Sequence, residues 1–141
     1  MIFTTDASAV VRWLIPGEEH EEQAIKLRND YAEGIVELNA PALLVYEALN
    51  ALWKAVERSN VSAEDALSIW KTFAKIEPKS IILDPEDLTR ALKIAITSRI
   101  SLYDASYIAT AIKTKSTLIT ADQGLCDIAK KHVKTIHLKD Y

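Results

Sequence analysis

The stretch T117-L-I-T-A-D-Q-G-L125 decides the fold class of this chain. Thr117–Thr120 combines β-branched and apolar residues in a short run, which predicts a buried strand, and a helical pattern follows from Gln123. Between the two lies one carboxylate, Asp122, at a place where a charge is costly to remove from water. Open α/β sheets bind ligands beyond the carboxyl ends of their strands, so this acid marks a candidate site.

Short apolar runs alternate with longer helical patterns along the rest of the chain. The expected strands are residues 2–5, 36–38, 81–83, 117–120 and 135–138. The expected helices are residues 7–14, 18–32, 41–58 (opened by Pro41), 62–78, 84–98, 101–113 and 123–132. Strands that alternate with helices pair in parallel through crossover connections. The pattern therefore predicts an α/β fold, a three-layer helix–sheet–helix sandwich with a central parallel sheet of four to five strands, in one domain over residues 1–141.

The composition is that of a globular protein, with 49% hydrophobic and 26% charged residues among 141, which excludes a disordered or collagen-like chain. The single cysteine, Cys126, cannot form an internal disulfide, and no leader-like segment opens the sequence, so we expect a cytoplasmic location. No apolar run reaches the ~18 residues that a membrane span requires. The formal charge is −7 over residues 1–70 and +4 over residues 71–141, so a positive face is an option in the second half.

Four carboxylates stand alone in apolar surroundings, whereas most acids of this chain have charged neighbours. They are Asp6 within residues 1–11, Glu47 within 38–53, Asp104 within 100–112 and Asp122 within 116–126. A purely structural role is open to three of them, because Asp6 and Asp122 can act as helix N-caps and Ser101-Leu-Tyr-Asp104 matches a capping box. Glu47 has no such role, since it lies inside an expected helix.

Converging carboxylates raise one another's pKa unless a cation or bound protons offset their charge. Oxygen ligands without histidine or cysteine favour Mg²⁺ or Mn²⁺, and such ions activate water for displacement at phosphorus. The hydroxyls of Ser8 and Thr120 lie near Asp6 and Asp122 in sequence and are candidates for a supporting role, with helix capping or strand packing open to each. Asn50 continues the polar line of Glu47 along the expected helix. The three histidines show no ligand spacing, and we expect them at the surface: His20, His132 and His137.

Four short motifs, in this order, resemble those of the PIN-domain nucleases. They are D6-A-S8, Y46-E-A-L-N50, L102-Y-D-A-S-Y-I-A109 and L118-I-T-A-D122. The resemblance covers the whole chain and is greatest to the small VapC-type toxin ribonucleases of prokaryotic toxin–antitoxin pairs. It implies a PIN fold, Mg²⁺- or Mn²⁺-dependent endonucleolytic cleavage of RNA, a homodimer and a cognate antitoxin. It assigns catalysis and metal binding to Asp6, Glu47, Asp104 and Asp122, and it places Ser8, Asn50 and Thr120 in supporting positions.

RNA binding requires cations outside the acidic centre, because carboxylates repel phosphate. The candidates by proximity in sequence are Arg12, Arg99, Lys113 and Lys115, and a solubility role is open to each. We expect most of the large aromatic side chains on the first four helices to be buried, namely Trp13, Tyr31, Tyr46, Trp53 and Trp70. Any that are exposed would suit a dimer seam or an antitoxin helix.

Two other functions fit parts of the pattern. A catalytically silent PIN fold could bind RNA or protein only, although the presence of all four acids argues against it. A phosphoacceptor receiver domain also gathers acids at strand ends, but it needs an acid pair after the first strand and a lysine after a late one. Here Asp6 stands alone, and Asp122 occupies the place of the lysine.

The residues after Asp122 predict a ranking among the acids. Many PIN relatives carry further charged residues there, whereas this chain has Gln123-Gly124-Leu125. We expect Asp122 to coordinate metal more weakly, so Asp122→Asn should lower nuclease activity less than Asp6→Asn or Asp104→Asn. Initial cleavage rates of the three variants check this order. Complete inactivation by all three would contradict it.

Overall fold

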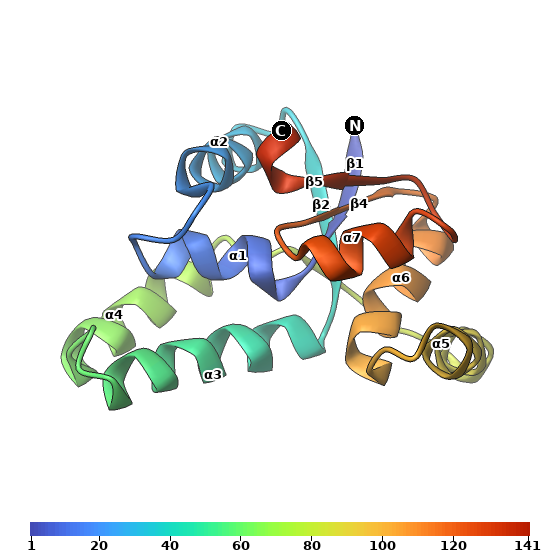
Figure 1. Cartoon of the computed structure of the whole chain (residues 1–141). Coiled ribbons are helices and arrows are strands. Elements are labelled where there is room, and N and C mark those ends of the chain that lie inside the picture. Colours follow the sequence, from blue (N-terminus) through green and yellow to red (C-terminus); the bar gives the residue numbers. More distant parts are fainter.

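The computed structural model describes all 141 residues and contains seven α-helices, five strands and one 3₁₀ turn (Figure 1). In chain order the elements are β1 (Ile2–Thr5), α1 (Ala7–Leu14), α2 (Glu21–Ala32), β2 (Glu37–Pro41), α3 (Leu43–Glu57), α4 (Ala63–Phe73), β3 (Lys79–Ile81), α5 (Pro85–Ser98), α6 (Leu102–Thr114), β4 (Thr117–Thr120), α7 (Gln123–Ala129), β5 (Thr135–His137) and η1 (Leu138–Asp140). No helix is both long enough and apolar enough to cross a membrane.

The five strands form one parallel sheet in the order β3-β2-β1-β4-β5. Helices cover both faces of the sheet, which confirms the three-layer α/β sandwich (Figure 1). β1 lies at the centre, between β2 and β4, and Thr5 is paired with Ile119. Because parallel strands end at the same edge, the residues that follow β1 and β4 are neighbours in space although more than a hundred positions separate them in sequence.

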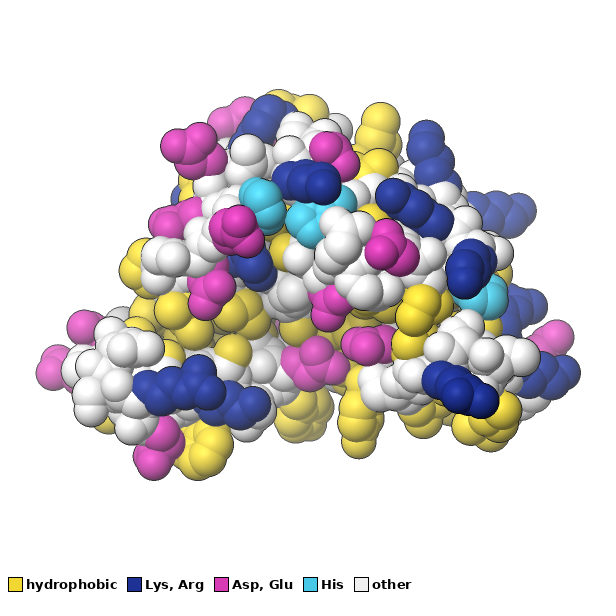
Figure 2. All heavy atoms as spheres, viewed as in Figure 1, with side chains coloured by type: hydrophobic (Ala, Val, Ile, Leu, Met, Phe, Trp, Pro, Cys, Tyr) yellow, Lys and Arg dark blue, Asp and Glu magenta, His cyan; other side chains and the backbone are white.

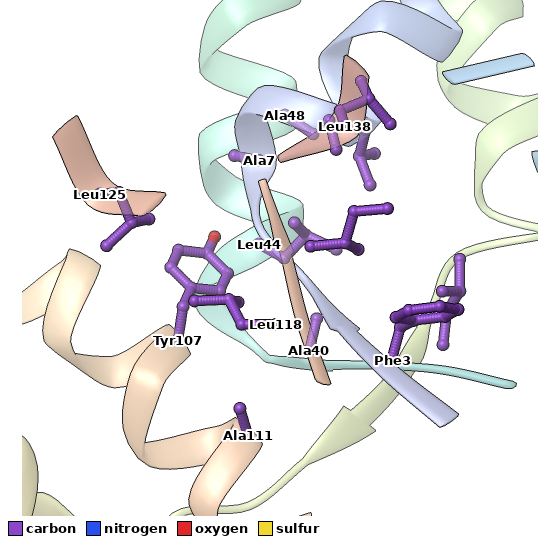
Figure 3. Packing of buried hydrophobic residues seen from close by; sticks show 14 of the residues in the cluster. Phe3, Ala7, Ala40, Leu44, Ala48, Tyr107, Ala111, Leu118, Leu125 and Leu138 are labelled. Atoms are coloured by element: carbon purple, nitrogen blue, oxygen red, sulfur yellow. The ribbon is translucent and has the colours of Figure 1, made fainter. Parts of the chain in front are cut away.

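β4 is buried along its whole length, as expected for an inner strand of a parallel sheet. Leu118 and Ile119 are fully buried in a hydrophobic cluster of 28 residues that draws on both helical layers. Figure 3 shows Leu118 close to Tyr107 of α6 and Leu44 of α3. The helices α5 and α6 pack along each other, and α6 lies against β1, β2 and β4. This packing fixes the first turn of α6 near the carboxyl edge of the sheet.

Several predicted boundaries were wrong, and two of them have a clear local cause. Pro41 ends β2, where it pairs with Ile81, so α3 starts two residues later than expected. α2 starts at Glu21 because Gly17 and His20 take left-handed backbone conformations. α4 ends at Phe73, five residues before Pro78, where the expected helix was to end. A proline disfavours helical backbone in the residue that precedes it. β3 is Lys79–Ile81 where residues 81–83 were expected.

The fold predicts that two isoleucines differ sharply in their contribution to stability. Ile119 is fully buried in β4, whereas Ile35 is 58% exposed in a loop. We expect Ile119→Ala to lower the free energy of unfolding by about 2–5 kcal/mol, because it leaves a cavity in the core. Ile35→Ala should change it by no more than about 0.5 kcal/mol. Urea unfolding measures both, and equal losses would contradict the assignment of β4 to the core.

Candidate active site

Asp6 directly follows β1 and is the N-cap of α1. Its carboxylate accepts hydrogen bonds from Ala9 N at 3.2 Å, Ser8 Oγ at 2.8 Å and Thr120 Oγ1 at 2.7 Å. The residue is only 4% exposed, and burial raises the pKa of the carboxyl to about 6 despite these hydrogen bonds, with a further increase from Asp122. The expected N-cap role is therefore confirmed, but capping does not remove the cost of this buried charge.

The ends of β1 and β4 are tied together by the hydroxyls of Ser8 and Thr120, which lie 3.2 Å apart. Ser8 Oγ accepts a hydrogen bond from Ala121 N at 2.9 Å, and Thr120 Oγ1 accepts one from Asp122 N at 3.0 Å. The Asp122 carboxylate in turn caps α7 by accepting from Leu125 N at 2.9 Å. Both hydroxyls thus hold Asp6 and the loop that carries Asp122 in one arrangement.

Glu47 and Asp104 approach from the two helices that flank this edge. Glu47 lies one turn inside α3 and is half-buried, and its pKa is raised to about 7 by burial, by Asp104 and by Asp6. Asp104 lies in the first turn of α6, where Ser101 is the N-cap, and its pKa is raised by burial and by Asp122. Figure 2 shows two acidic side chains next to each other between the start of α3 and α6. The four acids therefore act on one another.

A buried acid with a cationic partner behaves differently in this protein. Asp87 is 8% exposed and forms an ion pair with Lys113, and this hydrogen-bonded contact holds its pKa below the ordinary value. None of the four acids at the sheet edge forms an ion pair with any lysine, arginine or histidine. Their charge is uncompensated within the protein, which is the condition that a bound cation would relieve.

The donor set suits a hard divalent cation, because it offers several carboxylate oxygens and no cysteine or histidine. The side chains do not form a ready-made cage, however, since no three of the His, Cys, Asp and Glu side chains lie close enough together to hold a metal ion. Asn50 is exposed one turn after Glu47, and the two line a pocket of about 260 Å³ together with Leu43, Tyr46 and Tyr103. This pocket opens beside the acids.

Tyr107 belongs to the site and was not singled out from the sequence. Its side chain is buried on α6, one turn after Asp104 (Figure 3). Its hydroxyl lies close enough to the Glu47 carboxylate to offset part of the rise in the pKa of Glu47 that burial causes, although it completes no well-formed hydrogen bond. Burial raises the pKa of this hydroxyl, and Glu47, Asp6 and Asp104 raise it further. A small side-chain movement would complete the hydrogen bond from this buried donor to Glu47 and so help to hold that carboxylate. The spacing of Tyr107 from Asp104 was the one available signal.

The expectation that all three histidines lie at the surface was wrong for His137, which is 5% exposed at the end of β5. Its Nδ1 accepts a hydrogen bond from Lys139 N, so Nε2 carries the proton and donates to Ala121 O at 3.0 Å. His137 therefore supports the loop that carries Asp122. His20 packs against its ring edge-on, and His132 is exposed.

Two of the basic residues chosen by sequence proximity are occupied by other partners. Arg12 is held by Ser8 O and Glu19 O, and Lys113 is held by Asp87. Lys113 and Lys115 also lie at the end of α6 opposite Asp104, about 14 Å along the helix axis. Arg99 is exposed where α5 ends, three residues before the start of α6, so it stays a candidate phosphate contact. Of the aromatic residues, Trp13 is buried, whereas Trp53 and Tyr46 are 59% and 76% exposed.

Comparison with known proteins agrees with this architecture. The PIN-domain family model matches residues 4–131, and the chain belongs to the PIN-domain family. It is also homologous to a VapC ribonuclease: it is 30% identical to ribonuclease VapC3 of Pyrobaculum aerophilum over 131 residues, 90% of this chain and 94% of the relative.

Two solved structures have the same fold. PAE2754 from Pyrobaculum aerophilum is 27% identical, with a TM-score of 0.71 over 99% of this chain and 94% of that one. VapBC2 from Rickettsia felis, solved with a DNA fragment from its promoter, has a TM-score of 0.67 at 13% identity, over 97% of this chain and 98% of that one. The second likeness concerns the fold alone.

The raised pKa values predict how the stability of the metal-free protein depends on pH. Asp6 and Glu47 have higher pKa values when folded than the ordinary 3.8 and 4.5, so the folded state binds more protons than the unfolded state between about pH 4 and 7. Their contribution therefore destabilises the fold as pH rises through this window, on the order of 2–3 kcal/mol for Asp6 and less for the half-exposed Glu47.

Glu47→Gln isolates this effect from that of the other acids. With chelator present, the melting temperature of the variant should increase relative to that of the wild type as pH rises from 4.5 to 7.5, because only the wild type must ionise Glu47. Thermal unfolding in steps of pH checks this, and Glu57→Gln at the exposed end of α3 controls for the amide substitution. A difference in melting temperature between variant and wild type that does not change with pH would contradict the raised pKa of Glu47.

Proposed function

We propose that this protein is a Mg²⁺- or Mn²⁺-dependent endoribonuclease that acts as the toxin of a toxin–antitoxin pair. The observation that carries the proposal is the uncompensated charge of Asp6, Glu47, Asp104 and Asp122 at the carboxyl edge of a PIN-family sheet. A relative over nearly the whole chain is named a ribonuclease. A structural role alone gives no reason to leave these carboxylates without a counter-charge.

The four acidic side chains differ in how firmly hydrogen bonds hold them. Asp6 and Asp122 are fixed by hydrogen bonds from Ser8, Thr120 and backbone amides. Glu47 and Asp104 are partly exposed on separate helices, so their side chains can turn toward the fixed pair. We therefore assign metal binding to all four, with the site completed when Glu47 and Asp104 close on the cation. A bound Mg²⁺ would supply an activated water and stabilise charge on the leaving oxygen.

The supporting residues keep the carboxylates in position in this mechanism. Ser8 and Thr120 hold Asp6 in one orientation, which limits the rearrangement needed at the moment of reaction. Tyr107 offers a hydrogen-bond donor from inside the core, and Asn50 offers an amide at the pocket mouth.

The proposed partners are a cognate antitoxin and a second copy of the chain, as in VapC-type proteins. Two exposed apolar surfaces are available to them. One is a groove of about 320 Å³ between α3 and α4, lined only by hydrophobic residues that include Trp53, Leu67 and Trp70. The other is the outer face of α5, where Leu88, Leu92 and Ile96 are spaced one turn apart and exposed. Surfaces of this kind mark interaction sites.

A catalytically silent RNA- or protein-binding module is the alternative that one observation favours. No three potential ligands are close enough to hold a metal ion as they stand. If Glu47 and Asp104 cannot close on the fixed pair, the protein would bind partners without cleaving RNA. Metal binding by the intact protein distinguishes the two functions.

A circular, fluorescently labelled single-stranded RNA tests the proposal, because only an endonuclease can open it. We expect cleavage with Mn²⁺ or Mg²⁺, none with chelator, and a loss of at least about a hundredfold for Glu47→Gln, the order of a catalytic group. Glu33→Gln, a matched substitution in the exposed turn that follows α2, should cleave like the wild type. Cleavage in chelator, or equal activity of the two variants, would contradict the proposed site.

A further inference from the structure

Two cationic side chains continue the line of Glu47 along α3. Lys54 and Arg58 follow Glu47 by seven and eleven residues, so at 100° per residue both lie within about 20° of the direction of Glu47. They stand about 10 and 16 Å farther along the helix axis. Helical side chains lean toward the helix N-terminus, so Lys54 leans toward Glu47 and Arg58 toward Lys54. We call these two residues the α3 cationic stripe.

The stripe borders a depression of about 150 Å³ between α1 and α3. Ala51, a small residue between Glu47 and Lys54 in sequence, is part of its lining, as are Asn60 and one acid, Glu18, which lies 4.0 Å from Arg12. Lys54 and Arg58 are both exposed and form no ion pair, in contrast to Arg12, Lys26 and Lys113. Figure 2 shows basic side chains over the C-terminal half of α3, beside the two central acids. The surface therefore changes from negative to positive along one helix.

We propose that Lys54 and Arg58 bind backbone phosphates of a single-stranded RNA whose scissile phosphate lies at the acidic centre. This inference rests on the proposed function and adds the direction in which the strand leaves the site, along α3 toward α4. Carboxylates repel the phosphates next to the one that is cut, so affinity must come from cations a short distance away. The stripe is in line with Glu47, its side chains are free, and Ala51 leaves room for the chain between them.

A structural role also exists for cations at this position. Positive side chains in the last turn of a helix interact favourably with its dipole, by about 0.3–1 kcal/mol at an exposed surface. That role predicts an effect on the stability of α3 and none on RNA. An acidic protein segment is another possible occupant, but it would be repelled by Glu47 at the near end of the stripe, whereas RNA is drawn there by the proposed metal site.

The test compares two double variants of equal charge. Lys54→Gln/Arg58→Gln removes the stripe, and Lys130→Gln/Lys131→Gln removes two exposed lysines at the end of α7 opposite Asp122. Each pair is placed in the Glu47→Gln background, and binding of a labelled single-stranded RNA is measured by fluorescence anisotropy in Mg²⁺ over a range of salt concentrations. The same pairs in the otherwise unaltered protein are assayed on the circular RNA, and melting temperatures are recorded.

Loss of the stripe should weaken RNA binding by about tenfold or more and reduce the slope of log K against log salt by about 1.4, because two phosphate contacts to a single strand are lost. Lys130→Gln/Lys131→Gln should leave the RNA affinity and the salt slope unchanged. Neither double variant should lower the melting temperature by more than a few degrees. Unchanged affinity and slope, or equal losses in both pairs, would overturn the inference. Binding of labelled polyglutamate is measured in the same way. If loss of the stripe abolished polyglutamate binding and left RNA binding intact, the inference would also be overturned, and the stripe would be assigned to an acidic protein partner.

Failure of this inference is distinguishable from failure of the proposed function. If the circular RNA is cleaved equally well with and without the stripe, the nuclease stands and the path along α3 is wrong. If no RNA is cleaved but binding still depends on Lys54 and Arg58, the stripe stands and the protein is the silent binding module described above.

Discussion

The structure depends on one electrostatic constraint, which is that carboxylates meet at the carboxyl edge of a parallel sheet without a cationic partner. Pairing of Thr5 with Ile119 brings the ends of β1 and β4 together, and Ser8 and Thr120 then hold Asp6 beside the Asp122 loop. Burial and mutual repulsion raise the pKa values of Asp6 and Glu47 to about 6 and 7. A fold that maintains such a site loses stability near neutral pH unless protons or cations bind there.

The same constraint organises the proposed chemistry. Two acids are fixed and two are carried by helices, so a cation would complete the site rather than enter a finished cage. The acidic centre repels RNA when it is empty of metal, and affinity has to come from a separate surface. The α3 cationic stripe would meet that need, since Lys54 and Arg58 lie on the face of α3 that carries Glu47. Metal binding and RNA binding would then be adjacent but chemically distinct functions of one helix.

Much of this arrangement could be predicted from sequence, because the relevant signals are local. The alternation of short strands and helices gave the sandwich, and solitary acids in apolar runs located Asp6, Glu47, Asp104 and Asp122. Features that depend on distant contacts were missed. His137 was expected at the surface although it lies in the predicted strand 135–138, and it is buried because β5 pairs with β4. Tyr107 was not singled out, because the approach of its buried hydroxyl to Glu47 is visible only in three dimensions. The ion pair between Lys113 and Asp87 joins two helices and likewise could not be read from the sequence.

The central claim is that the uncompensated carboxylates form a divalent-cation site, and calorimetric titration of Mn²⁺ near pH 6.5 tests it most directly. In buffers that differ in ionisation enthalpy, the titration counts the protons released on binding. Asp6 and Glu47 are partly protonated at that pH, so we expect Mn²⁺ to bind and to displace protons, and both signals to be lost in Asp6→Asn. Absence of Mn²⁺ binding, or binding without proton release that persists in Asp6→Asn, would contradict the account.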